Sequence, residues 1–161
     1  PGVRWVHALA VGVDALLPEL KGVDRGRVQV TNSPGVAAKM LGEYCLGVML
    51  YFNKQLGRLH QASQAGSWDP FTMSCVSGKT VVLLGYGSIG QRVGRLCAML
   101  NMRVVAVRSE ETVAGLQAIP DEVVASSDRP NLARVLGGAD YVVCSLPSTT
   151  ATVGLVGEEL L

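Results

Sequence analysis

The sequence predicts an α/β fold built on a parallel β-sheet, and two observations lead to this prediction. Three short apolar runs, at residues 80–84, 104–107 and 141–146, are typical of strands buried on both faces, because they lack polar alternation. Helical patterns lie between these runs, at residues 89–100 and 130–136. Because parallel strands need crossover connections, this order predicts one half of a doubly wound sheet.

Two further strand candidates precede this unit. Residues 5–10 are apolar and end at a turn, 11–14, whose backbone amides could face a ligand, although a plain strand-to-helix loop is the simpler interpretation. His7 lies in this strand, where a lone histidine is more often a hydrogen-bonded core residue than a catalyst. Residues 28–31 form the second candidate, and the turn-forming residues 32–35 close it.

A long helix is expected next, from about residue 36 to about residue 65, where Gly66 and Pro70 interrupt the pattern. Apolar side chains occupy most of the circumference of its first half, namely Met40, Leu41, Tyr44, Leu46, Val48, Met49, Leu50 and Phe52. We expect burial on more than one side, either at a domain junction or subunit interface or in the centre of a core. His60, near the polar end, is expected to be solvated.

The apolar run at 80–84 ends at a G-x-G-x-x-G pattern formed by Gly85, Gly87 and Gly90. The first glycine permits a tight turn, the second lets the backbone approach a pyrophosphate, and the third lets the helix pack closely on the strand. Ordinary glycine-rich loops also match this pattern. Here a strand precedes it and a helix and a second strand follow, so we expect a Rossmann-type dinucleotide site with the phosphates at the helix N-terminus.

The region between Arg108 and Pro130 is polar and rich in turn residues, with a short helical stretch at 113–116. Asp128 and Pro130 then predict the start of a helix, which a glycine pair stops. This interpretation places three strands in the doubly wound sheet.

Composition suggests that the chain has a partner or a continuation. Its 161 residues are enough for one ordinary domain. A mean hydropathy of +0.32 with only 17% charged residues is apolar for a free-standing domain. The chain begins at Pro1 and stops without a closing signal, so we expect it to be an internal piece of a longer protein.

Several classes of protein find no support. The net charge of +1 and the lack of a basic run argue against a nucleic-acid partner. No apolar window of about eighteen residues and no signal peptide occur, which argues against a membrane partner. The four cysteines are far apart and not paired with histidine, which argues against a metal site and a disulfide framework and favours a reducing compartment.

Five short motifs occur in an ordered series along the chain. They are V-G-x-D at 11–14, N-x-P-G at 32–35 followed by Glu43, G-x-W at 66–68, S-G-K-T at 77–80, and A-D-Y-V-V at 139–143 continuing to L-P-S-T-T-A-T at 146–152. Together they resemble the D-isomer-specific 2-hydroxyacid dehydrogenases, over nearly the whole chain. One departure is Ala38, where many members have threonine near the cofactor.

The resemblance implies two domains. Residues 1–36 would be the end of a flavodoxin-like substrate domain, and residues 37–161 the N-terminal half of an NAD(P)-binding domain. It also implies a homodimer formed through the long helix, and a cytoplasmic location with an organelle left open.

The activity that the resemblance implies is that of an NAD(P)-dependent oxidoreductase acting on the CH–OH group of D-2-hydroxy acids, such as a glyoxylate or hydroxypyruvate reductase. In that family an arginine, a glutamate and a histidine act on the substrate, and all three follow the segment at 146–152. No catalytic residue is therefore assigned in this chain, and we expect the chain alone to be inactive. A dinucleotide-sensing, corepressor-like binding module is the alternative. A methyltransferase is a distant third, because it has no counterpart of the 146–152 segment.

The resemblance also implies which residues bind small molecules. These are Ser88 and Ile89 under the pyrophosphate, Leu146, Pro147 and Thr152 along the ribose side, and the backbone amides of Val11 and Gly12 at the carboxylate of a 2-oxo or 2-hydroxy acid.

The choice of cofactor depends on the end of the strand at 104–107. An NAD site holds an acid here that accepts hydrogen bonds from the ribose 2′-OH. This chain has Arg108 and Ser109, with no carboxylate before Glu110. A guanidinium can pair with the 2′-phosphate and Ser109 can donate a further hydrogen bond, so NADP(H) is expected over NAD(H). A solvated surface arginine is the alternative.

Overall fold

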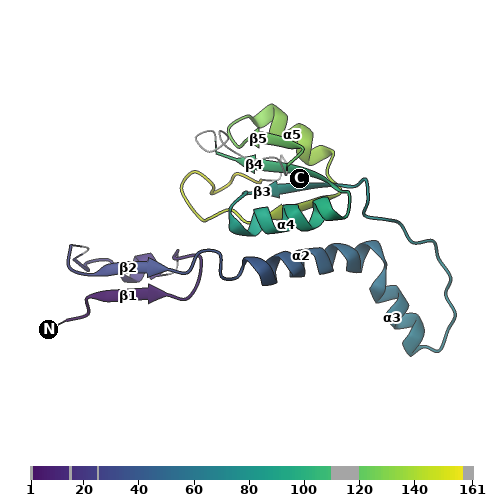
Figure 1. Cartoon of the computed structure of the whole chain (residues 1–161), viewed down its shortest axis with the longest axis horizontal. Helices are drawn as coiled ribbons and strands as arrows, with labels where there is room; N and C mark the ends of the chain where they lie inside the picture. The colour runs from purple at the N-terminus through teal and green to yellow at the C-terminus, as the bar shows by residue number, and fades with distance from the viewer. Residues whose placement is uncertain (1, 15, 25, 110–119, 158–161) are drawn as a thin grey trace.

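The computed structural model describes residues 2–14, 16–24, 26–109 and 120–157 and contains two separate parallel sheets (Figure 1). The smaller sheet pairs β1 (Trp5–Ala8) with β2 (Gln29–Asn32), and the short helix α1 (Leu16–Glu19) connects them. The larger sheet has the order β5-β4-β3-β6. Its strands are β3 (Thr80–Leu84), β4 (Arg103–Arg108), β5 (Glu122–Ala125) and β6 (Tyr141–Cys144). The predicted α/β class is confirmed.

Strand β3 is central, because it pairs with β4 on one side and with β6 on the other. Val81 and Leu83 pack into the core on one face and Val82 and Leu84 into the core on the other, and none of the four is more than 1% exposed. Helix α4 (Ser88–Met99) covers the first face and helix α5 (Arg129–Gly137) the second (Figure 1). A strand covered on both faces needs apolar residues at every position, which explains the unbroken run.

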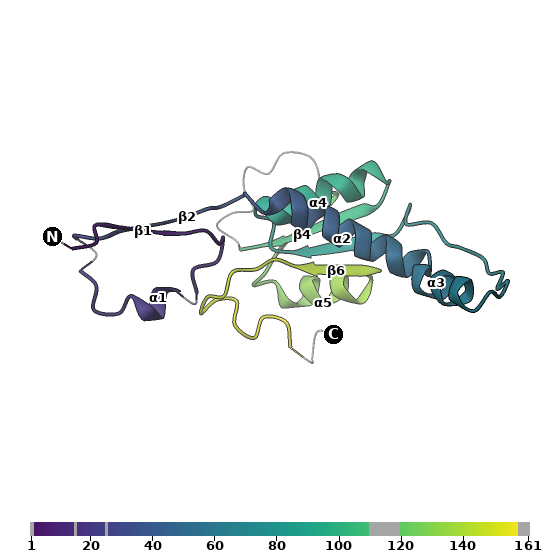
Figure 2. The ribbon, with the colours of Figure 1, turned by 90° about the horizontal axis from the view of Figure 1, so that it is seen from below.

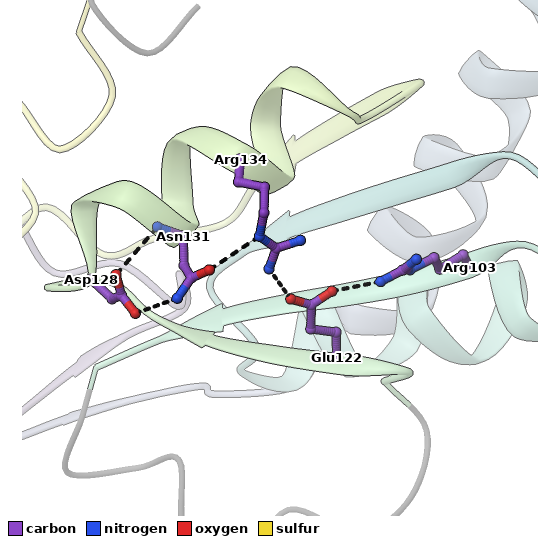
Figure 3. A network of polar contacts seen from close by, with 5 residues as sticks. All are labelled: Arg103, Glu122, Asp128, Asn131 and Arg134. Atoms are coloured by element: carbon purple, nitrogen blue, oxygen red, sulfur yellow. Dashed lines mark hydrogen bonds and ion pairs between the residues drawn. The ribbon is translucent and has the colours of Figure 1, made fainter.

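Strand β5 is missing from the prediction, which placed three strands in this sheet. It lies in the region expected to be polar and pairs in parallel with β4. Only Val124 of its four residues is buried, so its apolar pattern is too short to recognise. Glu122 joins the strand to its neighbours through ion pairs with Arg103 of β4 and Arg134 of α5 (Figure 3). The helical stretch predicted at 113–116 lies outside the described residues.

Helix α5 begins where the sequence predicts it. The carboxylate of Asp128 accepts hydrogen bonds from the backbone nitrogen and the side chain of Asn131, at 3.2 and 2.7 Å (Figure 3). These bonds hold the pKa of Asp128 below its usual value. The negative charge therefore faces the positive end of the helix dipole, and Pro130 occupies the first turn, where no N–H is needed.

The prediction of one continuous helix over residues 36–65 is wrong. It is two helices, α2 (Ala38–Asn53) and α3 (Leu56–Gln64), which meet at Gln55, whose φ of 50° is left-handed. His60 on α3 is exposed, as predicted. None of the helices in the described part of the chain is long and apolar enough to cross a membrane.

Tertiary contacts explain this break better than local propensity does. Lys54 and Gln55 are both good helix formers. However, the amide of Asn53 donates hydrogen bonds to Ser74 Oγ at 3.0 Å and to Tyr141 Oη at 3.4 Å, and Lys54 donates to the Ser74 carbonyl. The bonds to Ser74 attach the end of α2 to the loop that returns from α3 towards β3 (Figure 1), and the bond to Tyr141 attaches it to β6. The chain changes direction at the next residue, Gln55, and so leaves the axis of α2.

Within this chain helix α2 is covered along one side only. Gly42 and Met49 are buried on the side that faces α4, and Figure 2 shows the two helices running side by side. Met40, Tyr44 and Phe52 are 68–69% exposed. Within the described part of the chain this other side is uncovered, so its burial by another domain or subunit stays a prediction.

The contact between α2 and α4 leads to a prediction about two glycines. A Cβ on Gly42 would lie 2.5 Å from Cγ of Arg92, whereas a Cβ on Gly47 would meet nothing within 4 Å. Gly47→Ala is expected to raise the free energy of unfolding by about 1 kcal/mol through helix propensity. The free energy of unfolding of Gly42→Ala is expected to be roughly 1–3 kcal/mol lower than that of Gly47→Ala, because the added Cβ would be overpacked against Arg92. Urea denaturation checks this, and equal stabilisation by both changes would contradict the close contact.

The smaller sheet is exposed on its faces, and His7 is not the core residue that we expected. Trp5 is 61% exposed, and His7 is exposed as well. The His7 ring shares hydrogen bonds with Thr31 Oγ1 at 2.7 Å and Ser33 Oγ at 2.9 Å. No layer of the described chain covers β1, so its apolar residues stay accessible.

Candidate functional site

The chain makes its sharpest turn at the carboxyl end of β3. Gly85 has a φ of +92°, a left-handed conformation that favours glycine. A Cβ at this position would also lie 3.1 Å from the carbonyl carbon and oxygen of Ser145, in the segment that follows β6. The turn is therefore tight, and the backbones of two neighbouring segments meet at it.

Gly90 and Gly87 have opposite environments. A Cβ on Gly90 would lie 2.2 Å from the carbonyl oxygen of Gly85, so the first turn of α4 rests directly on the end of the strand. A Cβ on Gly87 would meet nothing within 4 Å, and this residue is exposed. The three glycines thus provide a turn, an open surface and a close contact, which are the properties that a dinucleotide pyrophosphate needs.

The N-terminus of α4 lies over this open surface. Its N-cap is Gly87, which has no side chain to accept hydrogen bonds from the first turn, and the first turn contains no acid. The N–H groups at a helix start have no intrahelical partner, and they carry the positive end of the helix dipole. Ser88 and Ile89 belong to this first turn, so the geometry suits an anion there.

The loop after β6 borders the glycine turn. Strand β6 ends at Cys144, two residues earlier than expected, and Ser145 Oγ then donates a hydrogen bond to the Gly85 carbonyl at 3.2 Å. Ser145 falls within the strand predicted over 141–146, so its pattern gave no sign of this role. The sheet continues from β3 to β4 on one side and to β6 on the other, so the glycine turn lies at the position where ligands bind in open α/β sheets.

Thr152 has a structural task within the same loop. Its hydroxyl accepts a hydrogen bond from the Thr149 backbone nitrogen at 2.9 Å and donates to the Pro147 carbonyl. Leu146 packs at the edge of the core, while Pro147 is exposed. Thr152 therefore shapes the loop that carries the other two residues.

Arg108 ends β4 on the side of the sheet that α4 covers. Val104 and Ala106 belong to the core cluster of that face, and side chains two residues apart on a strand share a face. Arg108 is partly buried, and Ser109 follows it on the surface. Both residues lie at the same edge of the sheet as the glycine turn.

The smaller sheet, formed by β1 and β2, faces this edge of the larger sheet. Its strands point with their carboxyl ends towards the larger sheet (Figure 1). Asn32 Nδ2 donates to the carbonyl of Val11 at 2.7 Å, which joins the end of β2 to the turn that contains Gly12. A Cβ on Gly35 would lie 3.9 Å from Cβ of Ser88, so the chain leaving β2 passes beside the N-terminus of α4.

Other kinds of site find little support. In the described ranges no cluster of three or more histidine, cysteine or acidic side chains could hold a metal ion. All four cysteines lie in these ranges and are free thiols, and burial raises the pKa of Cys97 to about 11. That thiol is therefore protonated and unreactive at neutral pH.

A strand, a glycine turn and a helix whose N-terminus is open at the carboxyl edge of a parallel sheet define a dinucleotide-binding protein. Residues 46–161 match the family described as D-isomer specific 2-hydroxyacid dehydrogenase, NAD binding domain. The chain belongs to this family.

The relatives of the chain agree with this assignment. It is similar to a glyoxylate reductase of Pyrococcus furiosus, 26% identical over 171 residues, and to a hydroxypyruvate reductase of Blautia hydrogenotrophica, 25% identical over 170 residues. These alignments cover 100% and 99% of the chain but 48% and 49% of the relatives. Among solved structures, a family member from Aeromonas salmonicida is 29% identical with a TM-score of 0.79, over 92% of this chain and 45% of that one. The chain thus spans about half the length of its relatives.

Proposed function

We propose that the protein containing this chain is an NAD(P)-dependent oxidoreductase that interconverts D-2-hydroxy acids and 2-oxo acids of the glyoxylate and hydroxypyruvate type. The observation that carries the proposal is the open helix N-terminus over Gly87, in a chain of this family. The names of the relatives support the substrate class.

The residues of this chain would bind and orient the reactants. The amides of Ser88 and Ile89 would hold the pyrophosphate, and the loop at 146–152 would line the ribose side. Residues 1–36 would belong to the substrate domain, where the amides of Val11 and Gly12 would meet the carboxylate of the acid. When bound, the dinucleotide would supply or accept the hydride at C2 of that acid. The arginine, glutamate and histidine implied by the resemblance lie outside this chain, so no proton transfer is assigned to it.

The cofactor proposed is NADP(H), with NAD(H) as the alternative. The support is Arg108 at the end of β4, where an NAD site holds an acid. A guanidinium forms charge-assisted, bidentate hydrogen bonds with phosphate, whereas a carboxylate would repel it.

Turnover assays separate an enzyme from a sensor. The full-length protein is expected to oxidise NADPH in the presence of glyoxylate or hydroxypyruvate, whereas residues 1–161 alone are expected to show no turnover above the buffer background. Turnover by the short chain would contradict the assignment of catalysis to other residues. Full-length protein that binds NADPH but turns over neither acid would favour the dinucleotide-sensing, corepressor-like alternative.

We also propose that the full-length protein is a homodimer formed through α2. Its uncovered side carries Met40, Tyr44 and Phe52, a large apolar area for a helix in contact with water. Two copies of one helix can cover each other across a two-fold axis, because such an interface is self-complementary.

Sedimentation of the full-length protein tests this interface. Wild type is expected to be a dimer at micromolar concentration, and Tyr44→Asp is expected to shift it towards monomer because a buried charge without a partner is costly. Ala133→Asp, on the exposed side of α5, is the matched control and is expected to leave the dimer intact. A wild-type monomer would contradict the proposal.

A further inference from the structure

Tyr86, between the first two glycines of the turn, lies beneath helix α4. It is only 4% exposed. A Cβ on Gly94 would lie 3.1 Å from its Oη and 3.2 Å from its Cε2, so the phenol ring lies against the helix at this glycine. Gln91 Nε2 donates to the Tyr86 carbonyl at 3.3 Å, one turn earlier. The phenol ring of Tyr86 thus lies against α4 at Gly94, and the Tyr86 backbone is joined to Gln91 of the same helix.

Two arginines lie on the elements that pack around this tyrosine. Arg95 follows Gly94 on α4, is exposed, and lies one turn beyond Gln91. Arg108 comes from the end of β4, on the face that α4 covers. Tyr86 belongs to the core cluster of that same face.

The electrostatics of the hydroxyl agree with this geometry. Burial raises the pKa of Tyr86, and the positive charges of Arg95 and then Arg108 oppose that rise. This agrees with the position of Arg95 beside Gly94, which the phenol ring contacts, and with that of Arg108 at the end of the strand that α4 covers. Neither α4 nor β4 contains an acidic residue that could neutralise this pair of charges from within the two elements.

Arg95 is exposed and Arg108 is only partly buried, so both guanidinium groups are accessible to an anion from solvent. A phosphate monoester carries about −1.5 to −2 charge at neutral pH and offers three acceptor oxygens, enough for two bidentate partners. This site lies at the end of β4 beside the glycine turn, where the ribose of a bound dinucleotide would be placed.

We propose that Arg95 is a second specificity-determining residue, which together with Arg108 binds the 2′-phosphate of NADP(H) beside the hydroxyl of Tyr86. The proposal rests on the proposed dinucleotide function and deepens it. A single arginine at this strand end, such as Arg108, is common in NADP sites. A second arginine on α4 makes the preference for NADP(H) over NAD(H) depend on two elements.

Binding titrations with the full-length protein test the role of Arg95. Arg95→Gln is expected to weaken NADPH binding by roughly tenfold or more while changing NADH binding by less than about twofold. Arg103→Gln, at the opposite end of β4, is the control for the same loss of charge and is expected to leave both affinities unchanged. Adenosine 2′,5′-bisphosphate and 5′-AMP serve as smaller probes, and only the first is expected to lose affinity in Arg95→Gln.

Each outcome has a definite meaning. An unchanged NADPH affinity in Arg95→Gln, or an equal loss for NADPH and NADH, would overturn the role of Arg95 while leaving the proposed function intact. An equal loss for both dinucleotides would mean that Arg95 does not distinguish the 2′-phosphate. Failure of wild type to bind either dinucleotide would overturn the proposed function itself.

Discussion

Gly90→Ala is expected to lower the free energy of unfolding by about 3 kcal/mol, the upper end of the usual cost of overpacking. The added Cβ would lie 2.2 Å from the Gly85 carbonyl oxygen, far inside contact distance. That oxygen cannot move away easily, because Gly85 N donates to the Val107 carbonyl at 3.0 Å and Ser145 Oγ donates to the oxygen itself. Helix α4 would have to shift along β3, which would disturb the packing of Val93 on the sheet.

Urea denaturation followed by circular dichroism measures this loss, and Gly87→Ala is the matched control. A Cβ on Gly87 meets open space, so its effect on unfolding is expected to stay within about 0.5 kcal/mol. The same methyl group would stand where the pyrophosphate is proposed to bind, so dinucleotide affinity is expected to fall. Gly90→Ala with wild-type stability would show that α4 does not rest on the turn. Gly87→Ala with unchanged cofactor affinity would place the phosphates elsewhere.

Arg108→Asp is expected to weaken the binding of NADPH by about 1.5–3 kcal/mol, the range for a hydrogen bond to a charged group. This corresponds to roughly a tenfold to 150-fold rise in Kd. The new carboxylate would repel the 2′-phosphate but can accept hydrogen bonds from a ribose 2′-OH, so NADH affinity is expected to be kept.

Titration of the full-length protein with both dinucleotides measures the change, and the ratio of the two affinities is its internal control. A variant that lost both affinities equally would have lost its fold or its pyrophosphate site. Equal affinities in wild type, or tighter binding of NADH, would show that Arg108 is only a surface arginine.

The elements predicted correctly are those whose signals lie in contiguous residues. Strand β3 is apolar throughout because helices cover both of its faces, and the turn after it needs glycine for steric reasons at Gly85 and Gly90. The start of α5 is predictable because the Asp128 cap and the proline that follows act on backbone groups a few residues away.

The elements predicted wrongly depend on residues far apart in the chain. Strand β5 has one buried side chain, and ion pairs from β4 and α5 complete its environment. The break at Gln55 follows from hydrogen bonds between the end of α2 and Ser74, which local propensity cannot indicate. His7 is exposed because a strand is buried only if another layer covers it.

The amino-acid sequence by itself determined the class of fold, the position of the glycine turn and the membership of a dehydrogenase family, because each depends on short, ordered patterns. Only the tertiary structure decided what the side chains around that turn do. Ser145 Oγ, for example, donates a hydrogen bond to the Gly85 carbonyl from 60 residues away. Tyr86 lies against Gly94, and α4 packs over β4, which ends at Arg108. Contacts of this kind arise from packing between elements, and no local pattern in the sequence encodes them.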